Sequence, residues 1–189
     1  MMNEELAAIQ QHLESHRNAD TVASLATVVP TGQRVLGVRV PVLNELAKQH
    51  KAGGLELARK LWQSGAFEER LLAAKIIGKC AAKNPDEALQ LIKTLARQLG
   101  DWAVCDTLGM EGTRPLLKKL SSEIWELAKT KLAEPGEWQR RFGLVLLTHF
   151  VDSPSHRPEI ERLLASVADD KRHYVKKAVA WVRRDLAKL

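Results

Sequence analysis

A tryptophan and an aspartate stand one helical turn apart in the segment 101–106, Asp-Trp-Ala-Val-Cys-Asp. Residues i and i+4 of a helix share a face, so Trp102 and Asp106 would lie together. Val104 and Leu108 would then point to the opposite side, where a core is expected. An indole can stack on a ring, and a carboxylate can stabilise a positive charge. This pair is therefore the first candidate for chemistry.

Residues of related type recur at intervals of about 36 positions, which is within the range of helical repeats. Moving along the chain from Asp106 by about 36 residues at a time, in both directions, leads to three cationic residues. Moving in the same way from Trp102 toward the C-terminus leads to two aromatic residues. The charged row is Arg70, Asp106, Arg141 and Lys177, and the aromatic row is Trp102, Trp138 and Tyr174. Equivalent positions of stacked repeats line up as ridges, so both rows are expected on one concave surface.

The net charge is +6, and its distribution is uneven. Residues 171–189 contain seven basic residues and one acidic residue, whereas the rest of the chain contains 22 of each kind. An excess concentrated in this way indicates either a polyanionic partner or a solvated basic helix.

A helical wheel of this last segment separates two faces. Val175, Val179, Val182, Leu186 and Leu189 cluster on the expected core side. The other face consists of Tyr174, Lys177, Trp181, Arg184 and Lys188. Aromatic groups among cations are typical of nucleic-acid binding. The alternative is that Trp181 packs on a neighbouring repeat beneath lysine stems.

Apolar residues recur at helical spacing along nearly the whole chain, and no segment shows sustained strand alternation. The pattern predicts about eleven helices. They are 4–16, 20–29, 41–51, 55–63, 67–82, 85–98, a short helix after Asp101, 121–132, 137–151, 157–168 and 171–189. Residues 36–41 are expected to form an extended connection. The fold class predicted from these pairs is all-α, a right-handed α-helical solenoid of HEAT-like repeats, in a single domain spanning residues 1–189.

Several function classes are not supported. No apolar run has membrane-spanning length, and the N-terminus lacks a signal-peptide pattern, so we expect a cytoplasmic protein with no membrane partner. Cys80 and Cys105 lie in apolar helical contexts and are expected to be buried, reduced thiols. His12 and His16 have no third ligand in view, and no phosphate-loop motif occurs. We therefore expect no metal and no cofactor.

Four segments together resemble the DNA alkylation repair family of HEAT-like-repeat DNA glycosylases. They are Gly37-Val38-Arg39-Val40-Pro41, Trp102-x-x-x-Asp106, Trp138-Gln139-Arg140-Arg141 and Lys177-Ala178-Val179-Ala180-Trp181-Val182-Arg183-Arg184. The resemblance extends from residue 37 to the C-terminus. Two features depart from the family pattern. Ala103 stands where members often have an acidic residue, and residues 1–61 contain no Phe, Tyr or Trp.

The resemblance implies an all-helical protein that cradles double-stranded DNA and excises cationic N3- or N7-alkylated purines. A curved solenoid with one DNA groove needs no partner subunit, so we expect a monomer. By position, Asp106 matches the essential carboxylate and Arg141 the family's arginine. Asp106 would stabilise the sugar oxocarbenium. Arg141 would hold a phosphate or the Asp106 carboxylate, and an ion pair between repeats is the alternative for these two residues. The DNA-binding set expected is Trp102, Trp138, Tyr174, Lys177, Trp181, Arg184 and Lys188.

Two other functions fit the same residues. The first is a non-catalytic HEAT-repeat DNA-binding protein that prefers bent or branched DNA. The second is a HEAT scaffold whose two rows form a groove for an acidic protein partner. Base release separates the first alternative from a glycosylase, and DNA binding at low salt separates the second from both.

Overall fold

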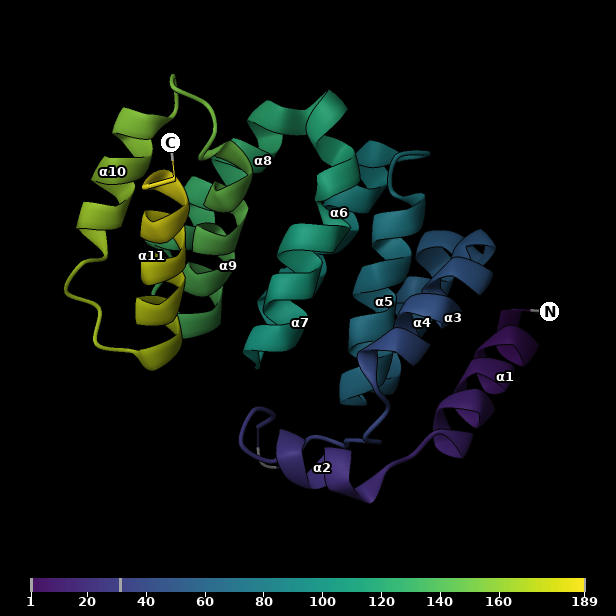
Figure 1. Ribbon diagram of the computed structural model, residues 1–189. Coiled ribbons are helices and arrows are strands. Elements are labelled where there is room, and N and C mark those ends of the chain that lie inside the picture. The colour runs from purple at the N-terminus through teal and green to yellow at the C-terminus, as the bar shows by residue number, and fades with distance from the viewer. Residues whose placement is uncertain (1, 31, 189) are drawn as a thin grey trace. The chain divides into compact units, whose positions relative to one another are not determined.

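The computed structural model describes residues 2–30 and 32–188, and in these ranges it contains helices and no strand (Figure 1). The prediction of an all-α fold is confirmed. The helices form two compact units, Met1–Leu116 and Leu117–Leu189. The solenoid of HEAT-like repeats and the single domain stay predictions.

In its described residues, 2–30 and 32–116, the N-terminal unit contains seven α-helices and four shorter helical elements. The α-helices are α1 (Met2–Ser15), α2 (Ala19–Leu25), α3 (Val40–Gln49), α4 (Gly54–Ser64), α5 (Phe67–Cys80), α6 (Pro85–Leu95) and α7 (Trp102–Thr107). The shorter elements are the 3-10 helices η1 (Lys51–Gly53), η2 (Ala96–Gln98) and η4 (Arg114–Leu116), and the π-helix η3 (Leu108–Gly112). As predicted, residues 36–39 form a connection without helix or strand, but α3 begins at Val40, inside the predicted range 36–41.

Helix α5 is the centre of the N-terminal unit. Most of its residues are buried, including its apolar side chains from Leu71 to Ile77, and it contacts α3, α4, α7 and η3. Its first turn is fixed by Glu69, whose carboxylate accepts hydrogen bonds from the backbone N–H of Ala66 at 3.2 Å and from Nε2 of Gln10 at 2.8 Å. Burial of apolar surface around the whole helix makes α5 the support on which α7 is positioned.

The C-terminal unit contains four α-helices and one 3-10 helix. They are α8 (Leu117–Ala133), α9 (Glu137–Leu147), η5 (Thr148–Phe150), α10 (Arg157–Ser166) and α11 (His173–Leu186). Helix α9 packs against both α8 and α11. Gly143 permits the close approach to α8, because a Cβ atom there would lie 2.7 Å from the carbonyl oxygen of Ala128.

Most predicted helices are confirmed, with shifts at their ends. Helix α8 begins at Leu117, before the predicted residue 121, but Leu120 is non-helical (φ −127°, ψ 35°) and breaks it near the predicted start. Both cysteines are buried and outside any disulfide, as expected, and burial raises the pKa of Cys80. None of the helices in the described part of the chain combines the length and apolar character needed to cross a bilayer.

Candidate active site

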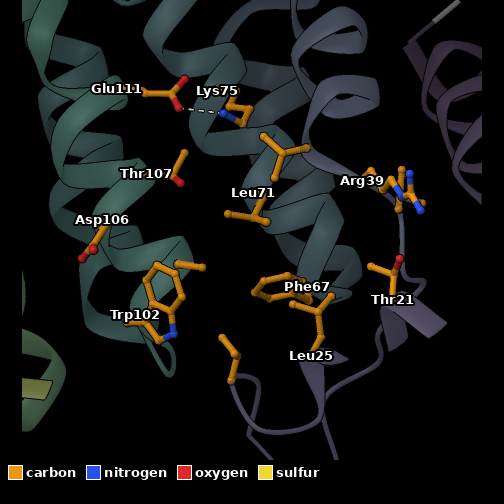
Figure 2. A pocket seen from close by; sticks show the side chains of 14 residues that line it. Thr21, Leu25, Arg39, Phe67, Leu71, Lys75, Trp102, Asp106, Thr107 and Glu111 are labelled. Atoms are coloured by element: carbon orange, nitrogen blue, oxygen red, sulfur yellow. Dashed lines mark hydrogen bonds and ion pairs between the residues drawn. The ribbon is translucent and has the colours of Figure 1, made fainter. Parts of the chain in front are cut away.

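A pocket of about 480 Å³ lies in the N-terminal unit, beside α7 (Figure 2). Its apolar lining comes from α2 and the turn after it, the connection that precedes α3, the first residue of α3, α5 and α7. These apolar residues are Leu25, Val28, Val38, Val40, Phe67, Leu71, Trp102 and Ala103. The polar lining residues are Thr21, Arg39, Lys75, Asp106, Thr107 and Glu111. An apolar pocket with a few polar groups is the usual form of a ligand site.

Trp102 and Asp106 both line this pocket, as the spacing of the sequence predicts. Trp102 is 37% exposed and Asp106 is half-buried, whereas Val104 and Leu108 on the other side of the helix are buried. Figure 2 shows Phe67 and Leu71 of α5 across the pocket from Trp102. The predicted local face is therefore confirmed, and the residues before 62 contribute only aliphatic and polar groups to the pocket.

The start of α7 is fixed by Asp101. Its side chain is almost fully buried and accepts a hydrogen bond from the backbone N–H of Val104 at 2.8 Å. Such a cap satisfies a donor that the first turn of a helix leaves unpaired. Burial raises the pKa of Asp101, although the hydrogen bonds from Val104 and Ala103 oppose that shift. Trp102 thus leaves the helix from a rigid first turn.

The continuation of α7 is the π-helix η3, which is anchored to α5 by an ion pair. Lys75 Nζ donates to Glu111 Oε1 at 2.6 Å, and the lysine side chain is only 6% exposed. Figure 2 shows this pair at the same pocket as Asp106. A π-helix is rare and often occurs at functional sites. Lys75 and Glu111 were not predicted from the sequence, although they are 36 residues apart, the same interval that separates members of the charged and aromatic rows.

Arg70, the first member of the charged row, has a different environment. Its guanidinium lies over the ring of Trp62, with its carbon 5.6 Å from the ring centroid. It is not among the residues that line the pocket.

The C-terminal unit brings Trp138, Arg141 and Tyr174 together. The rings of Trp138 and Tyr174 are 4.9 Å apart between centroids. Arg141 donates from Nη1 to the carbonyl oxygen of Tyr174 at 2.8 Å, and its guanidinium carbon lies 5.9 Å from that ring. Arg141 is buried. The contact between Trp138 and Tyr174, 36 positions apart, agrees with the predicted alignment of these two residues, whereas the contact of Arg141 with Tyr174 was not predicted.

An ionic network that the sequence analysis missed holds the start of α11 near the start of α9. The carboxylate of Asp170, only 3% exposed, accepts a hydrogen bond from Arg140 Nη1 at 2.7 Å and is also paired with Arg172. Arg172 donates in addition to the carbonyl oxygen of Pro135. These bonds, those of Arg172 above all, hold the pKa of Asp170 well below its usual range. The network positions Tyr174, whose backbone N–H donates to Glu137 Oε1 at 3.1 Å.

Helix α11 carries the predicted basic face. Lys177, Arg184 and Lys188 are exposed, and Trp181 is half-buried. Val175, Ala178, Val179, Val182 and Leu186 form the buried side; the predicted core residue Leu189 lies outside the described residues. A hydrogen bond from Lys188 Nζ to Asp185 Oδ1 at 2.7 Å lowers the pKa of Asp185, and the side chain of Trp181 contributes a further hydrogen bond. Trp181 is therefore directed toward the polar side of the helix.

The predicted site residues divide between the two units. Trp102 and Asp106 lie in the N-terminal unit, and Trp138, Arg141, Tyr174, Lys177, Trp181, Arg184 and Lys188 lie in the C-terminal unit. That all of them face one hollow stays a prediction. His12 and His16 stack at 4.3 Å between ring centroids. Within residues 2–30 and 32–188, no group of three His, Cys, Asp or Glu side chains could hold a metal ion.

Comparison with known proteins agrees with the residues that carry the resemblance. Neither the curated proteins nor the solved structures with which the chain was compared gave a match. The sequence model of one family, described as DNA alkylation repair enzyme, matches residues 9–189. That match includes the α7 pocket residues, the α9 arginines and the basic face of α11, so the chain belongs to the DNA alkylation repair enzyme family.

Proposed function

We propose that this protein is a DNA glycosylase that excises cationic N3- or N7-alkylated purines from double-stranded DNA. One observation carries the proposal. The carboxylate of Asp106 and the exposed indole of Trp102 border the same pocket in a member of an alkylation repair family. A cation-stabilising group beside a stacking group is what this reaction requires.

The chemistry needs little help at the base. A purine alkylated at N3 or N7 carries a positive charge, and it leaves as a neutral molecule when the bond from C1′ to nitrogen breaks. The electron pair of that bond stays with the purine, so the sugar becomes an oxocarbenium ion. Asp106 stabilises this cation and orients the water that adds at C1′, while the proton of that water passes to the carboxylate or to solvent.

The other predicted residues bind the DNA. Trp102 stacks on the lesion or presses on its sugar. Trp181 contributes an aromatic contact to the DNA from α11. Arg141 uses one of its donors to hold the carbonyl oxygen of Tyr174. In the complex we assign a DNA phosphate as a ligand of this guanidinium. Lys177, Arg184 and Lys188 neutralise other phosphates, with Trp138 and Tyr174 as the aromatic support beside them.

The test is release of methylated bases from methylated genomic DNA, followed by chromatography. The unaltered protein should release N3- and N7-methylpurines. Asp106→Asn should lower the rate of release by about 10²–10³-fold, because an amide does not carry the negative charge that stabilises the oxocarbenium. DNA affinity should change little. Asp86→Asn, an exposed aspartate at the start of α6, is the matched control and should release bases at the normal rate. An unchanged rate in Asp106→Asn would remove Asp106 from the mechanism.

A second candidate is a non-catalytic relative that binds bent or branched DNA. The observation that favours it is the wall formed by residues 21–40, which contributes Leu25, Val28 and Val40 but no aromatic ring. Tight binding to methylated or branched DNA without any base release would establish this function. Failure to bind DNA even at low salt would instead favour the acidic protein partner.

A further inference from the structure

The two most exposed large apolar side chains in the described ranges border the same pocket. Trp102 is 37% exposed and Val40 is 51% exposed, and each lines the pocket beside α7. They come from different elements, α7 and the start of α3. Exposed apolar groups that gather at one concavity indicate a surface that a ligand covers. The occupant therefore contacts the segment that ends at Val40 as well as α7.

That segment is held by a buried carboxylate. Glu68 is fully buried and accepts hydrogen bonds from three successive backbone N–H groups, those of Leu36 at 2.9 Å, Gly37 at 2.7 Å and Val38 at 3.3 Å. In the described part of the chain no cation pairs with Glu68. A buried charge is costly unless hydrogen bonds compensate it. The compensation here comes entirely from the backbone of residues 36–38, which is thereby fixed.

Gly37 makes the same segment rigid from the other side. Its φ is +79°, and a Cβ atom would lie 2.2 Å from the carbonyl oxygen of Asn18. Only glycine fits this position. The backbone at Gly37 is therefore restricted to one conformation, which places Arg39 and Val40 at the pocket.

Arg39 is the cation of the pocket that is available to a ligand. It is exposed and lines the pocket, and among the described residues its guanidinium makes no hydrogen bond or ion pair. The other lining cation, Lys75, is buried and bound to Glu111. In Figure 2 Arg39 lies on the side of the pocket opposite Asp106 and Trp102. A guanidinium in this position suits a phosphate.

We infer that Arg39 and Val40 form a second DNA contact, in which Arg39 binds a backbone phosphate and Val40 packs on the adjacent deoxyribose. Glu68 is the positioning residue of this contact. The inference rests on the proposed function in one respect, that the polyanionic partner is DNA. It adds to that proposal a phosphate site across the pocket from Asp106, independent of the basic face of α11.

The experiment measures the affinity of the full chain for a short, labelled, unmodified duplex at several salt concentrations. Arg39→Ala should lower the affinity on the order of tenfold. It should also reduce the slope of log K against log salt by about 0.9, the value for one lost phosphate contact. Arg39→Lys keeps the charge and should restore the slope. The matched control is Arg59→Ala, an exposed arginine on α4 that does not line the pocket, and it should change neither quantity.

A non-electrostatic contact has a different signature. Val40→Ser should weaken binding by about threefold and leave the salt slope unchanged, because it removes apolar contact area but no charge. If Arg39→Ala has the same slope as Arg59→Ala, the inference is overturned. Unmodified DNA keeps this result separate from catalysis. A protein that shows the slope change but releases no methylated base retains the Arg39 contact and loses the glycosylase proposal.

Discussion

The two compact units carry their charges in different ways. Residues 1–116 contain 14 basic and 13 acidic residues, and residues 117–189 contain 15 basic and 10 acidic residues, so their net charges are +1 and +5. The N-terminal unit places both signs at one pocket, where Asp106 and Glu111 lie with Arg39 and Lys75. The C-terminal unit exposes cations along α11. If the proposed function is correct, the contrast predicts that base release and most of the electrostatic affinity for DNA depend on different units.

Removing positive charges from the basic face of α11 should have the largest effect, because it should weaken DNA binding without slowing base release. The triple variant Lys177→Ala, Arg184→Ala and Lys188→Ala should lower the salt slope of DNA binding by about 2–3. The single-turnover rate of base release at saturating protein should stay near normal. Asp106→Asn is expected to lower the single-turnover rate and to leave the salt slope of DNA binding unchanged. If the triple variant bound DNA normally but released bases slowly at saturating protein, the assignment of binding to α11 and of base release to the α7 pocket would be wrong.

Asp170→Asn should lower the free energy of unfolding by about 1.5–3 kcal/mol. The reason is that Arg140 and Arg172 both lose their charged partner. The pKa of Asp170 is lower in the folded state than in the unfolded state. The network therefore stabilises the fold above a pH of about 4, and this contribution is lost as the pH falls further. Denaturant unfolding at neutral and acidic pH measures both effects. Asp170→Asn should flatten the acid branch of the curve. An equally steep acid branch in this variant would assign the loss of stability to other carboxylates.

A smaller effect is expected from the aromatic side chain of the pocket. Trp102→Ala should weaken binding to DNA that contains a lesion or an abasic-site analogue by about 1–3 kcal/mol, the value of one stacked ring. Trp102→Phe should recover part of this loss. Affinity for unmodified duplex should change less than affinity for the lesion. Equal losses on both DNAs would show that Trp102 contacts the backbone rather than the lesion.

Local features of the site could be predicted from the sequence because they depend on neighbours along one helix. The shared face of Trp102 and Asp106 follows from their i, i+4 spacing, and the two faces of α11 follow from its apolar period. Asp101 caps α7. Asn84 is a residue type common at helix N-caps, yet at the start of α6 it makes no side-chain cap hydrogen bond.

Features that join distant segments could not be predicted in this way. Glu68 with the backbone of 36–38, Lys75 with Glu111, and Arg140 with Asp170 each link residues about 30 or more positions apart. The sequence contains the charges but not the packing that makes them neighbours. The π-helix after α7 also has no local pattern that distinguishes it from a continuing α-helix.

The π-helix at Leu108–Gly112 separates two requirements on one continuous piece of chain. In an unbroken α-helix each additional residue turns everything after it by about 100°. The wider i→i+5 turn takes up an extra residue locally. Glu111 can therefore bond to Lys75 of α5 while Trp102 and Asp106, on the turns before it, keep their face toward the pocket.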